Sequence, residues 1–160
     1  MGNTPLGWAA KNGHKGVAEA LLAREDIDPD KEGDDDLTPL ILSICNRHEV
    51  VVKMLLGRED VDPNKSNDDG QIPLLLANEN MDEEVVEMLL GREDVSPNKL
   101  DKRARSPLWW AAFHGYEGIV KLLLGQGDVN PDKPNNKQTF RWASPGRKKA
   151  DPIQPKPHLY

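Results

Sequence analysis

Thr4-Pro5-Leu6 opens a pattern that recurs as Thr38-Pro39-Leu40, Ile72-Pro73-Leu74 and Ser106-Pro107-Leu108, each copy 34 residues after the last. Two further blocks keep the same spacing. A leucine pair stands at 21–22, 55–56, 89–90 and 123–124, and a proline-centred turn stands at 28–30, 62–64, 96–98 and 130–132. Three blocks in fixed register across four copies indicate an internal repeat, and a repeat of this length indicates a solenoid.

Each repeat unit is predicted to form two short helices followed by a long loop. Three of the four copies have Thr or Ser before the proline, which suits an N-cap followed by the first helical position. The second helix is amphipathic, with apolar residues at i, i+3 and i+4, as at Val51, Met54 and Leu55. Because one unit cannot bury this stripe alone, the units are expected to stack.

The middle units depart from this pattern at the ends of their first helices. Ile72 cannot cap a helix, which costs roughly 0.5–2 kcal/mol. Gly13 and Gly115 stand where the first helix ends, and a left-handed residue there favours glycine. Arg47 and Met81 replace them in the middle units. We therefore expect these units to be local weak points.

The copy from Ser106 to Gly115 reads Ser-Pro-Leu-Trp-Trp-Ala-Ala-Phe-His-Gly, and the first copy matches it from Thr4 to Gly13. This pattern resembles the ankyrin repeat. The stretch Arg-Glu-Asp-Val-Asp-Pro-Asn at 58–64 is similar to that of ankyrin arrays in filamentous fungi. The tetratricopeptide repeat has a similar length but lacks both motifs. The resemblance implies an all-α ankyrin-repeat solenoid, whose helix-turn-helix units are joined by β-hairpin-like loops.

The repeat predicts an array over residues 1–138, followed by a separate tail over 139–160. The units span about 4–37, 38–71, 72–105 and 106–138. The tail starts like a degenerate fifth unit that lacks Pro-Leu and continues as a flexible, basic, proline-rich segment. Two alternatives follow: the chain is a fragment of a longer array, or its tail folds back as a cap.

Composition limits the partners and the compartment. The net charge of −6 argues against a nucleic-acid partner, because phosphate neutralisation needs clustered Lys and Arg. No apolar run approaches the ~18 residues of a membrane span, so we expect no membrane partner. Cys45 is the only cysteine, which favours a reducing compartment. We expect an intracellular protein, in the cytoplasm or the nucleus, that is a monomer or part of a larger chain.

The residues that carry chemistry do not form a known catalytic or metal-binding motif. His14 and His48 share one repeat position, where the resemblance implies a structural hydrogen-bonding histidine. Cys45 has no activating neighbour in the sequence and is expected to be buried or half-buried. The acidic pairs after the second helices, such as Glu25-Asp26, lack the spacing of a calcium loop. We therefore expect a chain that is no enzyme and needs no cofactor or metal.

The resemblance implies a protein partner that meets the concave groove of the first helices. The residue after each Thr-Pro-Leu is Gly7, Ile41, Leu75 or Trp109, a row expected to line that groove. The next row, Trp8, Leu42, Leu76 and Trp110, is expected to pack inside the helix layer. Phe113 lies one turn after Trp109 and His114 flanks it. We predict a binding strip of Ile41, Leu75, Trp109, Phe113 and His114. Alternatively, Trp109 and Phe113 only cover the end of the stack.

The hairpin tips carry charges of opposite sign at the two ends of the array. The first has Glu32, Asp34, Asp35 and Asp36; the third has Lys99, Lys102, Arg103 and Arg105. Asp34, Asp35, Lys102, Arg103 and Arg105 are predicted to contact the partner, whose association rate would fall with added salt. Alternatively these are ordinary exposed loops. At the level of function, the alternative to a binding scaffold is a structural spacer in a larger multidomain repeat protein.

Overall fold

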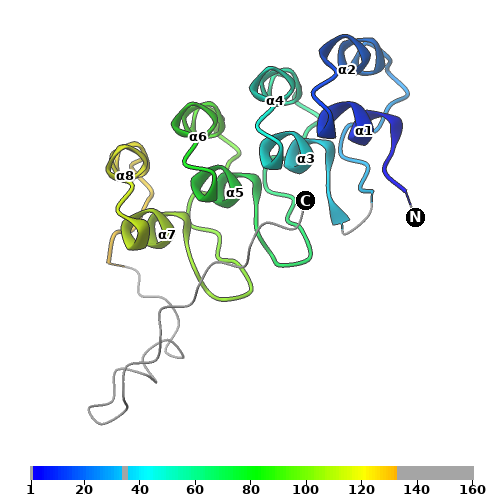
Figure 1. Cartoon of the computed structure of the whole chain (residues 1–160). Coiled ribbons are helices and arrows are strands. Elements are labelled where there is room, and N and C mark those ends of the chain that lie inside the picture. Colours follow the sequence, from blue (N-terminus) through cyan, green and yellow to red (C-terminus); the bar gives the residue numbers. More distant parts are fainter. Residues whose placement is uncertain (1, 34–35, 133–160) are drawn as a thin grey trace.

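The structure is a computed structural model that describes residues 2–33 and 36–132. The helices of these residues form four pairs: α1 (Pro5–Lys11) with α2 (Lys15–Leu22), α3 (Pro39–Cys45) with α4 (Glu49–Leu56), α5 (Pro73–Glu79) with α6 (Glu83–Leu90), and α7 (Pro107–His114) with α8 (Glu117–Leu124). The pairs stand in a row, with the first helices in one layer and the second helices in another (Figure 1). This confirms the predicted all-α repeat fold. The predicted tail at 139–160 lies outside the described residues.

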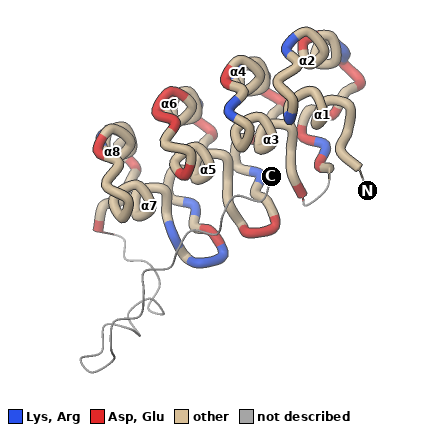
Figure 2. Tube along the Cα trace, in the orientation of Figure 1, with Lys and Arg blue, Asp and Glu red and all other residues tan. Residues whose placement is uncertain are grey.

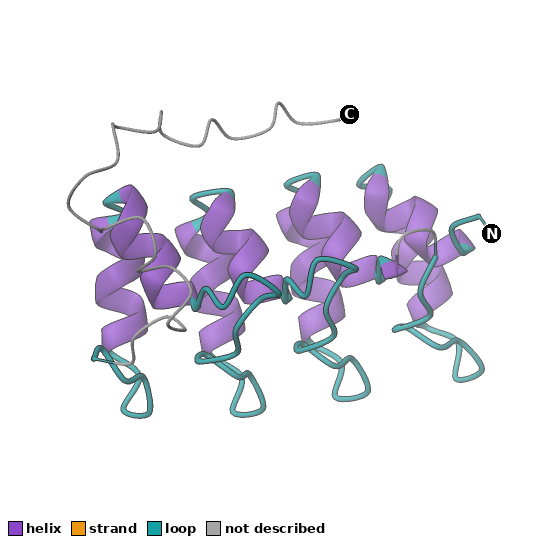
Figure 3. Cartoon of the chain, turned by 90° about the horizontal axis from the view of Figure 1, so that it is seen from below, coloured by secondary structure: helices purple, strands orange, loops and turns teal. Residues whose placement is uncertain are grey.

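Long loops connect one pair to the next. They leave each second helix on the same side of the array and project in parallel before the next first helix begins (Figure 3). The array therefore has two helix layers and a line of projecting loops, and the described residues contain no β-strand.

Each first helix begins at the residue that the sequence predicts. The side-chain oxygens of Thr4, Thr38 and Ser106 accept hydrogen bonds of 3.0–3.2 Å from the backbone N–H three residues later. Helix α5 begins after Ile72 without a side-chain cap, as predicted. The Ile72 side chain is buried, however, and this apolar burial offsets part of the lost cap.

The turn within each unit contains one left-handed residue. Gly13 and Gly115 have φ angles of 67° and 74°, and Arg47 and Met81 adopt 58° and 57° at the same repeat position. This conformation costs a residue with a Cβ roughly 1–2 kcal/mol, so the middle units carry the expected strain. Packing stabilises the two middle units, however, because each of them has a neighbouring unit on both sides. Their relative weakness therefore stays a prediction.

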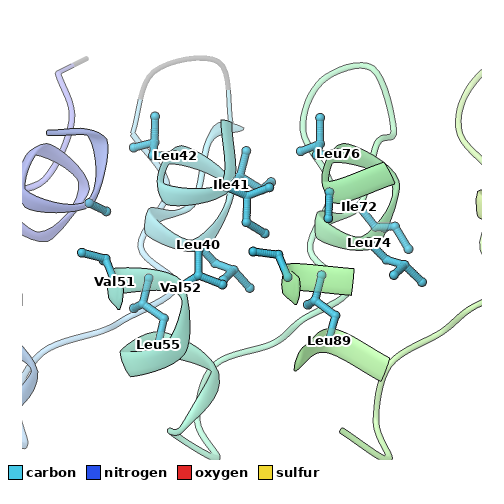
Figure 4. Packing of buried hydrophobic residues seen from close by; sticks show 14 of the residues in the cluster. Leu40, Ile41, Leu42, Val51, Val52, Leu55, Ile72, Leu74, Leu76 and Leu89 are labelled. Carbon is cyan, nitrogen blue, oxygen red and sulfur yellow. The ribbon is translucent and has the colours of Figure 1, made fainter. Parts of the chain in front are cut away.

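The hydrophobic core runs between the two helix layers along the whole array. In the second unit Leu40 of α3 points toward Val52 and Leu55 of α4 (Figure 4). Leu74 and Leu89 repeat this arrangement in the third unit (Figure 4). All five side chains are fully buried. The amphipathic stripes predicted from the sequence thus form one continuous core.

Arginine side chains tie the second and third units to the unit before each of them. Arg92 donates from Nη1 to the carbonyls of Leu56 and Arg58 and from Nη2 to that of Val61, at 2.8–3.1 Å. Its Nε and Nη2 also pair with the two carboxylate oxygens of Asp94, at 2.8 and 2.6 Å. One guanidinium therefore satisfies three backbone acceptors of the preceding unit while a carboxylate of its own unit holds it.

The arginines at the same repeat position in the other units show that the hydrogen bonds to backbone carbonyls require a preceding unit. Arg58 donates to the carbonyl of Leu22 and pairs with Asp60. Arg24 has no described unit before it and pairs only with Asp26. Its side chain is 63% exposed, against 17% for Arg92.

A second set of hydrogen bonds joins the turns that follow the second helices. Asn64 Oδ1 accepts from the N–H of Ser96 at 2.7 Å, and Asn64 Nδ2 donates to the carbonyl of Asp94 at 2.6 Å. The equivalent residue of the first unit is Asp30. Its Oδ2 accepts from the N–H of Asp62 at 2.7 Å, but its Oδ1 is buried without a hydrogen bond. An aspartate thus stands where the next unit uses an amide.

We expect Asp30→Asn to stabilise the fold by about 1 kcal/mol at pH 7, because the added amide can donate to the carbonyl of Asp60, the equivalent of the Asn64 acceptor. Burial raises the pKa of Asp30. The folded chain therefore binds the Asp30 proton more tightly than the unfolded chain does. Stability is lost as the pH rises through the pKa of Asp30 in the unfolded chain and then its pKa in the folded chain. The gain from the substitution should shrink as the pH falls through these pKa values, because the protonated aspartate carries no buried charge.

Chemical denaturation of both proteins at pH 4 and pH 7 measures this effect. The matched control is the reverse change, Asn64→Asp, which should cost about 1 kcal/mol at pH 7 because it removes the amide that donates to the carbonyl of Asp94. A D30N variant no more stable than the wild type at pH 7 would contradict the interpretation.

Candidate functional site

The row that follows Thr-Pro-Leu is buried and does not line a surface. Ile41 and Leu75 are 0% and 1% exposed, so the predicted binding strip is wrong at these two residues. The row points toward the next unit: a Cβ on Gly7 would lie 3.4 Å from Cδ1 of Leu42. Trp109 continues this row in the last described unit, where it is half-buried.

The neighbouring row lies about 100° further around each helix, and its two leucines, Leu42 and Leu76, are buried as well, at 4% and 7% exposed. We call it the first-helix row: Trp8, Leu42, Leu76 and Trp110. Leu42 and Leu76 point away from the second helices, toward the side of the hairpin loops (Figure 4). Leu42 and Leu76 are buried, as expected, but Trp8 is 50% exposed, which corrects its expected place in the core. Trp110 is half-buried against the core. This row and its flanks form the candidate functional site.

Aromatic side chains gather on α7. Trp109 and Phe113 stack with their ring centroids 5.0 Å apart, and Trp110 lies 4.4 Å from the ring of His114. Phe113 and His114 meet edge to face at 5.0 Å. The structure therefore brings together three predicted site residues, and Phe113 is 67% exposed. Trp109 and Phe113 lie at the end of the described array, so both the groove and the end-covering alternative keep a structural basis.

A buried ion pair shapes the surface beside Trp110. The guanidinium of Arg105 lies 4.3 Å from the Trp110 ring centroid and pairs with Oδ2 of Asp101 at 2.6–2.7 Å. Oδ1 of Asp101 accepts from the N–H groups of Arg103 and Arg105 at 2.9 and 2.8 Å. Arg105 thus has its charge neutralised within its own hairpin. Its side chain forms part of the surface beside Trp110, but its charge is already paired with Asp101.

Charged side chains connect neighbouring hairpins into one surface. Lys102 donates from Nζ to the carbonyl of Asp68, and its N–H donates to the carbonyl of Asp69 at 3.2 Å. Lys65 lies 3.4 Å from the carboxylate of Glu32 in the hairpin before. Basic residues are concentrated in the loop between α6 and α7, and acidic ones in the neighbouring loop (Figure 2).

The charged side chains that were predicted to contact the partner differ in whether they already form hydrogen bonds within the chain. Lys99 donates to the carbonyl of Asn64 at 2.7 Å, so it belongs with Lys102 and Arg105 among the engaged side chains. Arg103 is exposed and forms no side-chain hydrogen bond to the described residues. Asp34 and Asp35 lie outside the described residues, so their predicted contacts stay predictions.

The groups that could carry chemistry have structural roles or weak reactivity. His48 Nε2 lies 3.0 Å from the carbonyl of Lys11, which confirms the structural role predicted for it. Cys45 is exposed, against expectation. Desolvation by the surrounding protein and the charge of Glu79 raise the pKa of its thiol to about 11, so it is a poor nucleophile at neutral pH. Among the described residues, no three His, Cys, Asp or Glu side chains are placed to hold a metal ion.

The stacked helix pairs, the capped Thr-Pro-Leu starts and the projecting loops define a helical-repeat solenoid. A family model described as ankyrin repeats in three copies matches residues 1–67 and 51–135. The chain belongs to the ankyrin-repeat family. Repeats of this family are generally protein–protein interaction modules and typically non-catalytic. No curated protein matches the chain significantly, so the closer likeness to fungal arrays stays a prediction. None of the described helices has the length and apolar character needed to cross a bilayer.

Proposed function

We propose that the chain is a non-catalytic scaffold that binds a protein partner along the first-helix row and the hairpin tips. The observation that carries this proposal is the pair of exposed aromatic residues at the two ends of the first-helix layer, Trp8 and Phe113. Leu42 and Leu76 lie between them and are buried. Large aromatic side chains are typical anchors of protein interfaces.

Charge supports the same surface. Lys11 lies 5.1 Å from the Trp8 ring, and Arg103 offers an exposed guanidinium near Glu79. Asp34 and Asp35 are proposed to contribute the opposite charge at the first hairpin. A partner with complementary charges would associate faster at low salt than at high salt. The single cysteine of the chain fits an intracellular site of action.

A capture experiment with matched variants tests the proposal. The purified chain, the double variant Trp8→Ala/Phe113→Ala and the control Val50→Ala serve as baits, and bound proteins are quantified by mass spectrometry. Val50 is exposed on α4, so it controls for the loss of any surface apolar residue. We expect at least a tenfold loss of a captured partner with the double variant and none with V50A. Equal recovery from all three baits contradicts this placement of the site.

A second candidate function is a spacer within a larger repeat protein. Val17 on α2 is exposed, whereas Val51 and Val85 at the same repeat position are buried under the preceding unit. This exposed end fits the stacking of another unit. Baits that capture nothing beyond a tag-only control would favour the spacer.

A further inference from the structure

A cavity of about 310 Å³ lies between the third and fourth units, at the turns that follow α6 and α8. Its lining comprises Leu90, Gly91, Arg92, Glu93, Val95, Pro97, Gln126 and Asp128. These turns are separate from the first helices.

The repeat explains why a cavity opens at this junction. Gln126 stands at the repeat position that Arg58 and Arg92 occupy in the second and third units. At the junction before, the guanidinium of Arg92 reaches three carbonyls of the preceding unit. Moving those acceptors forward by one repeat gives Leu90, Arg92 and Val95, and all three line the cavity. The shorter, uncharged glutamine leaves the space of the arginine open.

The carboxylate that would hold the guanidinium is also retained. Asp128 is the repeat equivalent of Asp94, which pairs with Arg92 through two parallel hydrogen bonds. Among the described residues, neither the Asp128 carboxylate nor the Gln126 amide group has a side-chain hydrogen bond. The junction therefore keeps the acceptors of a guanidinium site and lacks only the cation.

We propose that this cavity binds the guanidinium group of an arginine side chain supplied by another polypeptide. A planar guanidinium can pair bidentately with Asp128 and still donate to the carbonyls of Leu90, Arg92 and Val95. Leu90, Val95 and Pro97 provide apolar walls for the aliphatic stem of the arginine. An ammonium group has no planar fork and fits this acceptor set less well.

Titration of the full chain with N-methylguanidinium at constant ionic strength, followed by NMR, tests the site. We expect saturable shifts of the backbone amides of Val95 and Gln126, and at least tenfold weaker binding of methylammonium. In the variant Gln126→Arg the new side chain fills the cavity, so binding should weaken at least tenfold. Shifts that do not saturate, or that are unchanged in Q126R, overturn the proposal.

A second variant keeps the proposal testable if Q126R does not fold. Arg92→Gln should open an equivalent cavity one unit earlier and add a second saturable site, reported by the amide of Val61. An R92Q chain that shows only the wild-type site would contradict the assignment of the cavity to a missing arginine.

A comparison of amino-acid amides tests whether an arginine side chain can supply the guanidinium. N-acetylarginine amide is expected to bind at least as tightly as N-methylguanidinium, and N-acetyllysine amide at least tenfold more weakly. If N-methylguanidinium binds and the arginine amide does not, an arginine side chain is excluded as the ligand.

Discussion

Leu89→Ala is expected to lower the free energy of unfolding by about 2–5 kcal/mol, the largest effect of any substitution considered for this chain. Leu89 is fully buried on α6, in a unit with a neighbour on each side. Shortening it removes apolar contacts and leaves a cavity that the packed helices fill only in part. Urea denaturation followed by circular dichroism measures the change.

The matched control is another leucine from the same sequence block. Leu124 ends α8 and is 49% exposed, so Leu124→Ala should cost less than about 1 kcal/mol. If both variants lose the same stability, the burial pattern of the second helices is wrong.

Arg92→Gln should lower the free energy of unfolding by about 2–3 kcal/mol, the second largest expected effect. The substitution removes the donor of three carbonyls in the preceding unit and leaves those acceptors without their charged partner. Hydrogen bonds to charged groups contribute about 1.5–3 kcal/mol each, but water can reach part of this site, so the sum is not realised. Urea denaturation and hydrogen exchange at the junction of the second and third units measure the loss.

Arg24→Gln is the control for this substitution. Arg24 has the same repeat position and the same pairing with an aspartate two residues later, but no carbonyls of a preceding unit. We expect no measurable loss of stability in R24Q. A loss as large as that of R92Q would mean that the local ion pair, and not the link between units, provides the stability.

The fold could be predicted from the sequence because every unit repeats the same local signals. A capping residue before proline, an amphipathic second helix and a left-handed turn recur at fixed spacing, so each unit supports the prediction for the others. The signal even predicted the exceptions, since Ile72 lacks a side-chain cap and Met81 adopts a left-handed conformation.

The candidate site was harder to predict, because the outward face of a seven-residue helix depends on its rotation about its axis. One residue along a helix turns a side chain by about 100°, and the row of Ile41 and Leu75, which was expected to line the groove, is buried.

The roles of the charged residues depended on contacts between units. Lys99, Lys102 and Arg92 donate to carbonyls 31–36 residues earlier, and no local pattern reveals those acceptors. The repeat spacing does reveal an exception, however. The series Arg24, Arg58, Arg92 changes to Gln126 in the fourth unit, and this break marks the cavity.

Hydrogen exchange of the chain with and without its captured partner tests the central claim most directly. We expect the partner to slow exchange in α1, α3, α5 and α7 and in the hairpin loops before α3, α5 and α7. Exchange in α2, α4, α6 and α8 should change little. Protection confined to the second helices would contradict the claim that the first-helix row binds the partner.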